Sequence, residues 1–235
     1  MPYAAHRPPL EAVLFDFHGT LAMVEDPSRC VTLAAAACGV ALGAQRRDTL
    51  AAAMARVGLA TGWPPPVIPP GLEAAWERRD LSSADHRALF VGVAGLMDSG
   101  IPGLPEAMYD RLLDPDGWLP YADTLPVLAA LRERGIATAL VSNIGFDVRP
   151  IGKAYGFAEL LDAWVLSYEV GVCKPDPAIF RHACAELGVD PRRTLMVGDT
   201  VADAAAVEAG CRALVLPTSP PGVRHGLDAV LGMLA

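Results

Sequence analysis

The sequence predicts an α/β fold, in which a doubly wound, parallel (Rossmann-like) sheet forms the core and an α-helical cap domain is inserted into it. Two patterns support this prediction. Short apolar runs rich in Val, Leu and Ile alternate with helical patterns, as buried parallel strands and crossover helices do. In addition, one long stretch after the first run shows helical patterns and no convincing strand.

Five apolar runs have the length and composition of strands that are buried on both faces. We expect the first of them to lie at the centre of the sheet, flanked by the second and the fourth. In chain order the runs are Ala12–Phe17, Ala137–Ser142, Trp164–Ser167, Thr194–Gly198 and Ala213–Leu216.

The helices between the later strands have recognisable start and stop residues. Asp123 is placed to cap a helix that ends at Gly135. Asp176 is placed to cap the next helix, which has Pro177 in its first turn and ends at Gly188. Strands that alternate with such helices predict right-handed crossovers and a parallel sheet.

The helical stretch runs from about Ala22 to about Trp118. A Pro-rich, stiff linker at Trp63–Gly71 divides it. We therefore predict a core made of residues 1–21 and 119–235, and a helical cap domain made of residues 22–118. The helices expected in the cap lie near Arg29–Leu42, Gln45–Leu59, Leu72–Arg79 and Ala84–Asp98.

Composition excludes several classes of protein. The net charge is −8 and the Lys and Arg residues are scattered, which disfavours a nucleic-acid-binding groove. The longest apolar stretch, Val31–Ala44, is too short and too rich in Ala and Gly to span a membrane. The N-terminus shows no signal-peptide pattern, and the five cysteines are odd in number and form no CxxC, so we expect free thiols and a cytoplasmic location.

Polar residues follow the predicted strands at the points where they end. Asp16 ends the first run, Ser142 and Asn143 end the second, and Lys174 follows the third. Asp199 ends the fourth, and Asp203 lies four residues further on. Ligands of open parallel sheets bind beyond the carboxyl ends of the strands, so we expect these residues to form one site.

The segments DFHGTL, VSN, KPDPAIF and GDTVAD resemble the four motifs of the haloacid dehalogenase-like (HAD) superfamily. The resemblance covers roughly Glu11–Leu21 and Leu119–Leu216, and the helical insertion occupies the position of that superfamily's cap. The stretch SYEVGVCKPDP is similar to the dehalogenase/phosphatase branch. The resemblance implies a Mg²⁺-dependent phosphatase that hydrolyses a small phosphorylated metabolite through an aspartyl-phosphate intermediate.

The resemblance assigns Asp16 as the nucleophile, and a carboxylate nucleophile divides hydrolysis into formation and breakdown of an acyl phosphate. Because the carboxylate and the phosphoryl group repel each other, a cation is needed, and Mg²⁺ prefers oxygen ligands. Asp16 and Asp199 would supply carboxylate ligands, and the resemblance implies that His18 supplies its backbone carbonyl. Asp203 is expected to orient the waters on the metal.

The remaining motif residues are expected to bind the phosphate group. Lys174 is a compact positive charge that can offset the carboxylates and the transferring phosphoryl group. Ser142 and the backbone N–H of Asn143 would hold phosphate oxygens. Gly19 and Thr20 suit the close approach of an anion to the backbone.

His18 departs from the pattern, because phosphatases of this superfamily usually carry an Asp two residues after the nucleophile. Imidazole can act as acid and base near neutral pH, so we expect His18 to replace that Asp in catalysis. Two alternatives stay open: a 2-haloacid dehalogenase that works without metal, and a non-catalytic member that binds a phosphorylated ligand or a protein. The sequence is compatible with a monomer or a homodimer.

Overall fold

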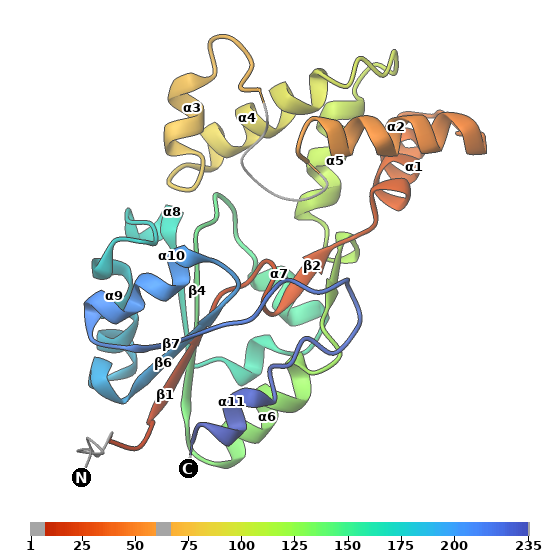
Figure 1. Ribbon diagram of the computed structural model, residues 1–235. Coiled ribbons are helices and arrows are strands. Elements are labelled where there is room, and N and C mark those ends of the chain that lie inside the picture. Colours follow the sequence, from red (N-terminus) through yellow and green to blue (C-terminus); the bar gives the residue numbers. More distant parts are fainter. Residues whose placement is uncertain (1–7, 60–66, 235) are drawn as a thin grey trace. The chain divides into compact units, whose positions relative to one another are not determined.

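The computed structural model describes residues 8–59 and 67–234 of the chain (Figure 1). The chain divides into two compact units. The first comprises the chain up to Met23, Pro120–Asn143 and the chain from Tyr155 onward, and the second comprises Val24–Leu119 and Ile144–Ala154. The second unit thus includes a short segment that follows the second predicted strand, in addition to the long helical stretch.

The first unit is built on a five-stranded parallel sheet in the order β5-β4-β1-β6-β7. β1 lies between β4 and β6, so the predicted central position of the first strand is confirmed, and so is the α/β fold class (Figure 1). All residues of β1 and β6 are buried, which explains why these strands are continuous apolar runs. The strands are β1 (Ala12–Phe15), β4 (Ala137–Ser142), β5 (Ala163–Leu166), β6 (Thr194–Gly198) and β7 (Arg212–Val215).

Helices cover both faces of this sheet. Figure 1 shows α9 and α10 on one side and α6 and α11 on the other. On the first side, Ile179 and Phe180 of α9 pack against strand residues such as Leu14, Val141 and Met196, all of them fully buried. The helices of this unit are α6 (Thr124–Glu133), α8 (Ser167–Val170), α9 (Pro177–Leu187), α10 (Val201–Ala204) and α11 (Ala229–Gly232), with 3₁₀ turns at Ala158–Leu160, Pro191–Arg193 and Ala205–Ala209.

The predicted ends of α9 are confirmed. The carboxylate of Asp176 accepts the backbone N–H of Ala178 at 2.8 Å, which satisfies one of the unpaired donors of the first turn. Gly188 follows the helix with a φ of 67°, in the left-handed region that glycine adopts at little cost. The helix therefore begins two residues after Pro175, with the N-cap residue Asp176 between them.

The predicted position of Asp123 at the start of α6 is confirmed, since it is the N-cap residue. Its side chain, however, makes no capping hydrogen bond to the helix. Its carboxylate instead accepts the backbone N–H groups of His225, Gly226 and Leu227 at 2.8, 2.8 and 2.9 Å. This carboxylate therefore anchors a C-terminal loop from a position 102 to 104 residues earlier in the chain.

The second unit is helical and has its own apolar core. Val31, Leu89, Val93 and Leu104 are buried at its centre. Its helices are α1 (Pro27–Ala37), α2 (Ala44–Arg56), α3 (Glu73–Arg78), α4 (Ser83–Gly95), α5 (Leu104–Leu113) and α7 (Arg149–Ala154), with a 3₁₀ turn at Pro115–Gly117.

The sequence prediction missed two features of this region. Helix α5 lies where no helix was expected, and two short strands, β2 (Ala22–Val24) and β3 (Trp118–Pro120), pair in a second sheet. Three-residue strands are too short to show the alternation by which strands are recognised. The first part of the predicted linker Trp63–Gly71 lies outside the described residues.

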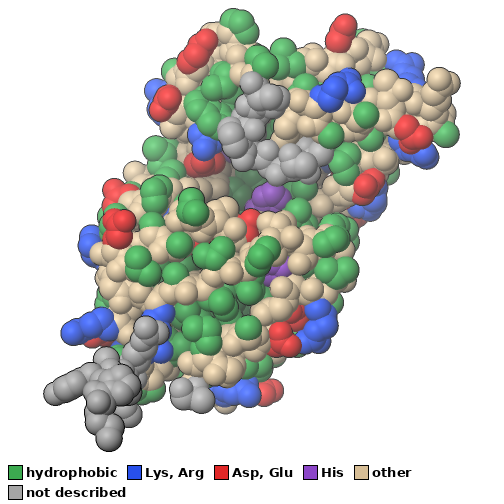
Figure 2. All heavy atoms as spheres, in the orientation of Figure 1, with side chains coloured by type: hydrophobic (Ala, Val, Ile, Leu, Met, Phe, Trp, Pro, Cys, Tyr) green, Lys and Arg blue, Asp and Glu red, His purple; other side chains and the backbone are tan. Residues whose placement is uncertain are grey.

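The charged side chains of the described residues are dispersed. On the face shown in Figure 2, basic and acidic groups are interspersed and neither sign forms a continuous stripe over the described surface. Within residues 8–59 and 67–234, no helix combines the length and hydropathy needed to cross a bilayer.

Candidate active site

Three predicted site residues lie where the central strands end. Asp16 directly follows β1, Ser142 is the last residue of β4, and Asp199 directly follows β6. Because the parallel pairing aligns Phe15 with Leu140 on one side and with Val197 on the other, these ends meet at one edge of the sheet. This is the edge at which open parallel sheets bind ligands.

Lys174 joins two of the carboxylates at this edge. Its Nζ donates to Oδ1 of Asp16 and to Oδ1 of Asp203, both at 2.6 Å. The lysine is 5% exposed, so the ammonium group has exchanged water for these two carboxylates. A buried cation of this kind needs such partners, because burial of an unpaired charge is very costly.

Asp203 is held by hydrogen bonds on both of its oxygens. Oδ1 accepts from Lys174, and Oδ2 accepts from the backbone N–H and the hydroxyl of Thr200, at 3.0 and 2.7 Å. The carboxylate lies against Gly198, where any Cβ would overlap it. With both oxygens engaged, Asp203 suits a supporting role better than a direct metal ligand.

Asp16, Asp199 and Asp203 each offer an oxygen atom, and these atoms lie within 4.8 Å of one another. Lys174 is bound to Oδ1 of Asp16, and the hydroxyl of Thr218 donates to Oδ2 of Asp199 at 3.0 Å. The second oxygen of each of these two carboxylates remains for a cation. A donor set of carboxylate oxygens fits a hard ion such as Mg²⁺ and does not fit a soft metal.

The pKa values of the groups in this cluster are shifted by burial and by the charges of their neighbours. Burial raises the pKa of Asp16 to about 6, although Lys174 lowers it, and burial also raises the pKa of Asp199. Burial lowers the pKa of Lys174, but Asp16 and Asp203 outweigh it and raise that pKa. Burial raises the pKa of Asp203, but Lys174 and the hydrogen bonds from Thr200 together outweigh it and hold that pKa below its usual value. Three carboxylates thus share the positive charge of one lysine. A further cation would stabilise their ionised forms.

Asn143 has a role that the sequence did not reveal. Its side-chain amide donates to the backbone carbonyl of Lys174 at 2.7 Å, and its Oδ1 accepts the backbone N–H of Lys174 at 2.7 Å. The residue after β4 thus fixes the backbone of the lysine from both sides. The prediction that the backbone N–H of Asn143 binds phosphate stays untested.

The turn after β1 is closely packed against Asp199. Gly19 has a φ of 86°, and a Cβ at this position would overlap Oδ2 of Asp199, so only glycine fits. Thr20 is fully buried, and its hydroxyl has no hydrogen-bond partner among the described residues. An unpaired buried hydroxyl at this turn is a donor that a bound anion could satisfy.

His18 lies between Asp16 and this turn. Burial lowers the pKa of its imidazole, although Asp16 beside it acts in the opposite direction. The ring is therefore neutral near pH 7 and holds one nitrogen that can accept a proton. Its backbone forms a bridge to Ala22, which keeps the turn closed.

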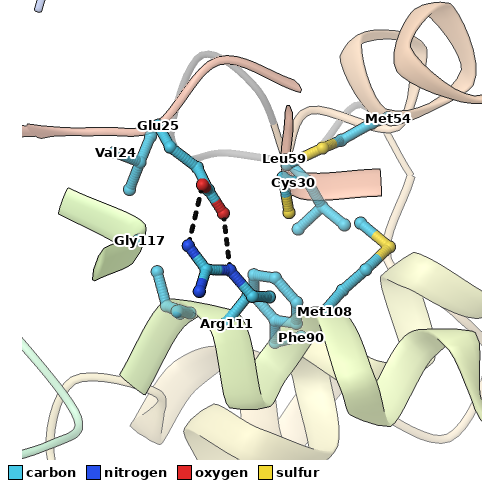
Figure 3. Close-up of a pocket in the computed structure, with 10 residues that line it drawn as sticks. Val24, Glu25, Cys30, Met54, Leu59, Phe90, Met108, Arg111 and Gly117 are labelled. Carbon is cyan, nitrogen blue, oxygen red and sulfur yellow. Dashed lines mark hydrogen bonds and ion pairs between the residues drawn. The ribbon is translucent and has the colours of Figure 1, made fainter. Parts of the chain in front are cut away.

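The helical unit contains a second buried charged cluster. The carboxylate of Glu25 faces the guanidinium of Arg111 in a two-pronged ion pair, with contacts of 2.8 and 2.9 Å (Figure 3). Arg29 adds a contact of 2.6 Å to the same carboxylate, and Arg111 also binds Asp114. The pair closes one side of a cavity of about 30 Å³ that is otherwise lined mainly by apolar side chains, among them Cys30, Met54, Leu59, Phe90 and Met108.

Comparisons with known proteins agree with this geometry. The chain matches the haloacid dehalogenase-like hydrolase family over residues 10–210. It is 33% identical over 154 residues to the N-acetylmuramic acid 6-phosphate phosphatase of Pseudomonas aeruginosa, across 63% of this chain and 65% of that protein. It is 40% identical over 80 residues to the phosphoserine phosphatase of Thermus thermophilus, across 34% of this chain and 32% of that protein.

A dehalogenase is also among the similar proteins. The chain is 33% identical over 96 residues to (S)-2-haloacid dehalogenase 1 of a Pseudomonas species, across 40% of this chain and 42% of that protein. The alignments therefore span less than two thirds of the length of each of these relatives.

Solved structures share the fold over nearly the whole chain. A dehalogenase structure matches 96% of this chain and 97% of its own, with a TM-score of 0.65 and 21% identity. A HAD phosphatase from Thermococcus onnurineus matches 95% and 99%, with a TM-score of 0.57 and 23% identity. The family match over residues 10–210 shows that the chain belongs to the haloacid dehalogenase-like hydrolase family.

Proposed function

We propose that this protein is a Mg²⁺-dependent phosphatase that hydrolyses a small phosphate monoester, with Asp16 as the nucleophile. The observation that carries the proposal is the cluster of three carboxylates around one buried lysine. Similarity to phosphatases that act on a sugar phosphate and on phosphoserine supports the same class of substrate.

The reaction divides into two displacements. A carboxylate oxygen of Asp16 forms a bond to phosphorus, while the bond from phosphorus to the leaving alkoxide breaks. Water then attacks the phosphorus of the aspartyl phosphate, which releases inorganic phosphate and restores Asp16. Lys174 offsets the negative charge that gathers on the phosphoryl oxygens, with Ser142, the N–H of Asn143, Gly19 and Thr20 as further contacts to that group.

Asp16, Asp199 and the backbone carbonyl of His18 would hold Mg²⁺, with Asp203 behind them as a supporting carboxylate. When bound, the ion supplies positive charge that lowers the repulsion between the carboxylate and the phosphoryl oxygens.

His18 is proposed as the acid/base. A proton on its imidazole would pass to the leaving alkoxide, and the neutral ring would then accept a proton from the attacking water. The low pKa that burial imposes favours the second task over the first. We expect His18→Ala to slow the hydrolysis of alkyl phosphates, which have poor leaving groups, more than that of aryl phosphates. Equal rates for the variant and wild type on an alkyl phosphate would contradict this role.

The helical unit is proposed to act as a cap that selects the substrate and excludes water during the reaction. This proposal rests on its insertion after β1 and on its own apolar core.

The direct test is hydrolysis of a generic aryl phosphate by wild type and by Asp16→Asn, with Mg²⁺ and with chelator. We expect release of phosphate that needs Mg²⁺ and that falls by at least about a thousandfold in the variant, as is usual when a nucleophile is removed. Equal rates in wild type and variant would contradict Asp16 as the nucleophile.

One alternative keeps a specific observation in its favour. His18 stands where phosphatases of this superfamily usually carry an Asp, and a 2-haloacid dehalogenase is among the relatives. That enzyme class would release halide from a 2-haloacid in the presence of chelator, so an assay for halide distinguishes the two functions.

A further inference from the structure

A loop near the C-terminus reaches the candidate metal site. The hydroxyl of Thr218 donates to Oδ2 of Asp199 at 3.0 Å. Thr218 follows β7 and lies outside all four motif segments, and 19 residues separate it from Asp199. This contact is therefore a product of the fold, which a reading of local motifs does not reveal.

The side chain of Asp199 is confined on its other side. The same Oδ2 atom lies against Gly19, where a Cβ would overlap it. The backbone just before Asp199 is also held, because the N–H of Leu216 donates to the carbonyl of Gly198 at 2.9 Å. Asp199 is thus placed between a turn that lacks a side chain and a threonine hydroxyl.

Thr218 itself is exposed, so its position depends on how firmly its loop is held. The hydroxyl of Tyr121 donates to the carbonyl of Ser219 at 2.9 Å, and the ring of His225 stacks on the ring of Tyr121 at 4.3 Å. The N–H of Ala122 donates to the carbonyl of Val223 at 2.9 Å.

The end of the loop is held most strongly of all. The buried carboxylate of Asp123 accepts three consecutive backbone N–H groups, those of residues 225–227. Three adjacent residues, Tyr121, Ala122 and Asp123, therefore bind both halves of the loop. A loop that is fixed at several points can present one hydroxyl at a defined place with little further loss of entropy.

We propose that Thr218 is a positioning residue, which fixes the carboxylate of Asp199 in the orientation that binds the metal ion. The inference rests on the metal site of the proposed function. With Oδ2 held by the hydroxyl, Oδ1 is the atom that Asp199 presents to the cation. Partners behind a metal ligand usually change metal affinity when they are removed, by about ten- to a hundredfold.

The test measures metal binding in the absence of substrate as well as turnover. Mn²⁺ serves as the probe, with binding followed by electron paramagnetic resonance. We expect Thr218→Val, which keeps the shape and removes the hydroxyl, to weaken Mn²⁺ binding by on the order of tenfold. It should raise the Mg²⁺ concentration for half-maximal hydrolysis by the same factor, with kcat at saturating Mg²⁺ close to wild type.

Two control variants separate the hydroxyl from the loop. Thr218→Ser keeps the donor and should restore the wild-type affinity for Mn²⁺. Ser219→Ala changes the neighbouring side chain and leaves the carbonyl that Tyr121 binds, so its affinity should also equal that of wild type. A loss of affinity in Ser219→Ala as large as in Thr218→Val would overturn the inference, since the loop as a whole would then be responsible.

The outcomes for Thr218 and for the proposed function differ. Thr218→Val could show Mg²⁺-dependent hydrolysis whose half-maximal Mg²⁺ concentration equals that of wild type. This result would overturn the role of Thr218 and would not contradict the proposed phosphatase activity. If the protein hydrolyses no phosphate ester but Thr218→Val binds Mn²⁺ more weakly than wild type, the positioning role of Thr218 is supported. The proposed phosphatase activity is then contradicted. A wild type that binds no Mn²⁺ would overturn the inference.

Discussion

Two charged clusters among the described residues differ in the balance of their positive and negative charges. In the sheet unit, three carboxylates share a single buried lysine, so two negative charges stand in excess when all are ionised. In the helical unit, Glu25 and Asp114 are matched by Arg111 and Arg29, so the charges cancel. Both clusters are built from similar groups, and what separates them is whether the protein supplies enough positive charge.

This difference bears on the proposed role of each cluster. A balanced and fully hydrogen-bonded cluster needs nothing from solution, and its role is to hold the chain in one arrangement. In the unbalanced cluster, burial and the neighbouring carboxylates raise the pKa values of Asp16 and Asp199, and a bound cation would stabilise the charged forms of both. Charge balance thus distinguishes the Glu25–Arg111 ion pair from the candidate active site, although the carboxylate of Glu25 is as buried as that of Asp16.

The largest effect on turnover is expected when the excess of negative charge in the sheet unit is increased. Lys174→Met would leave three carboxylates without their buried cation. We expect turnover of an aryl phosphate to fall by about a hundred- to a thousandfold, since one electrostatic stabiliser of the transition state is lost. In chelator the unfolding free energy should fall by about 3 kcal/mol. Mg²⁺ should then raise the melting temperature more in the variant than in wild type.

Lys153 provides a matched control, because it is exposed and is the other lysine of the chain. Lys153→Met should leave both turnover and stability near wild type. A Lys174→Met protein whose melting temperature does not respond to Mg²⁺ would argue against a cation site at the carboxylates.

A smaller effect, on stability alone, is expected in the balanced cluster. Glu25→Leu would leave the partly buried Arg111 without its main partner, and we expect a loss of about 3 kcal/mol in urea unfolding. The double variant Glu25→Leu/Arg111→Met should recover much of this loss, because apolar side chains already line the adjacent cavity. Turnover per folded molecule should stay near wild type in both.

The exposed ion pair of Arg224 and Asp228 provides a control for that measurement. Arg224→Ala should reduce the unfolding free energy by no more than about 1 kcal/mol. If Glu25→Leu costs no more than Arg224→Ala, the buried pair does not contribute to stability as proposed.

The smallest of the three effects concerns Asp123, whose carboxylate forms no ion pair with the described residues. Burial raises the pKa of Asp123, but the N–H groups of His225, Gly226 and Leu227 outweigh it and hold that pKa below its usual value. Asp123→Asn should therefore reduce the unfolding free energy at pH 7 by about 2 kcal/mol.

The pH dependence of this effect follows from its sign. A lowered pKa in the folded state contributes stability above the unfolded pKa of about 3.9, and this stability is lost as the pH falls through the folded pKa. The difference between wild type and Asp123→Asn should thus shrink below about pH 4. A difference that stays constant from pH 7 to pH 3 would show that the carboxylate charge is not what holds the loop.

The sheet was predictable from sequence because its strands are continuous apolar runs that end in polar residues. Asp16, Ser142 and Asp199 could be found in this way, since the position of a strand end follows from local pattern. The short strand Ala22–Val24 could not, because three residues carry no periodicity, and neither could helix α5.

The supporting contacts of the site were beyond the sequence for a different reason. Asn143 binds the backbone of Lys174 from 31 residues away, and Asp123 binds the loop of Thr218 from about 100 residues away. Side chains of these types are common at turns and helix starts, and Asp123 was interpreted as a cap on that basis. Only the fold shows which distant backbone each one meets.

The short segment Ile144–Ala154 has a consequence for protein engineering. It directly follows Asn143, yet it belongs to the helical unit. Within that unit, Phe146 packs on the rings of His86 and Trp118, and a Cβ at Gly145 would overlap the backbone carbonyl of Arg79. Grafting residues 24–119 alone onto a relative would leave these surfaces without their partner, so a transplant of the helical unit has to carry residues 144–154 with it.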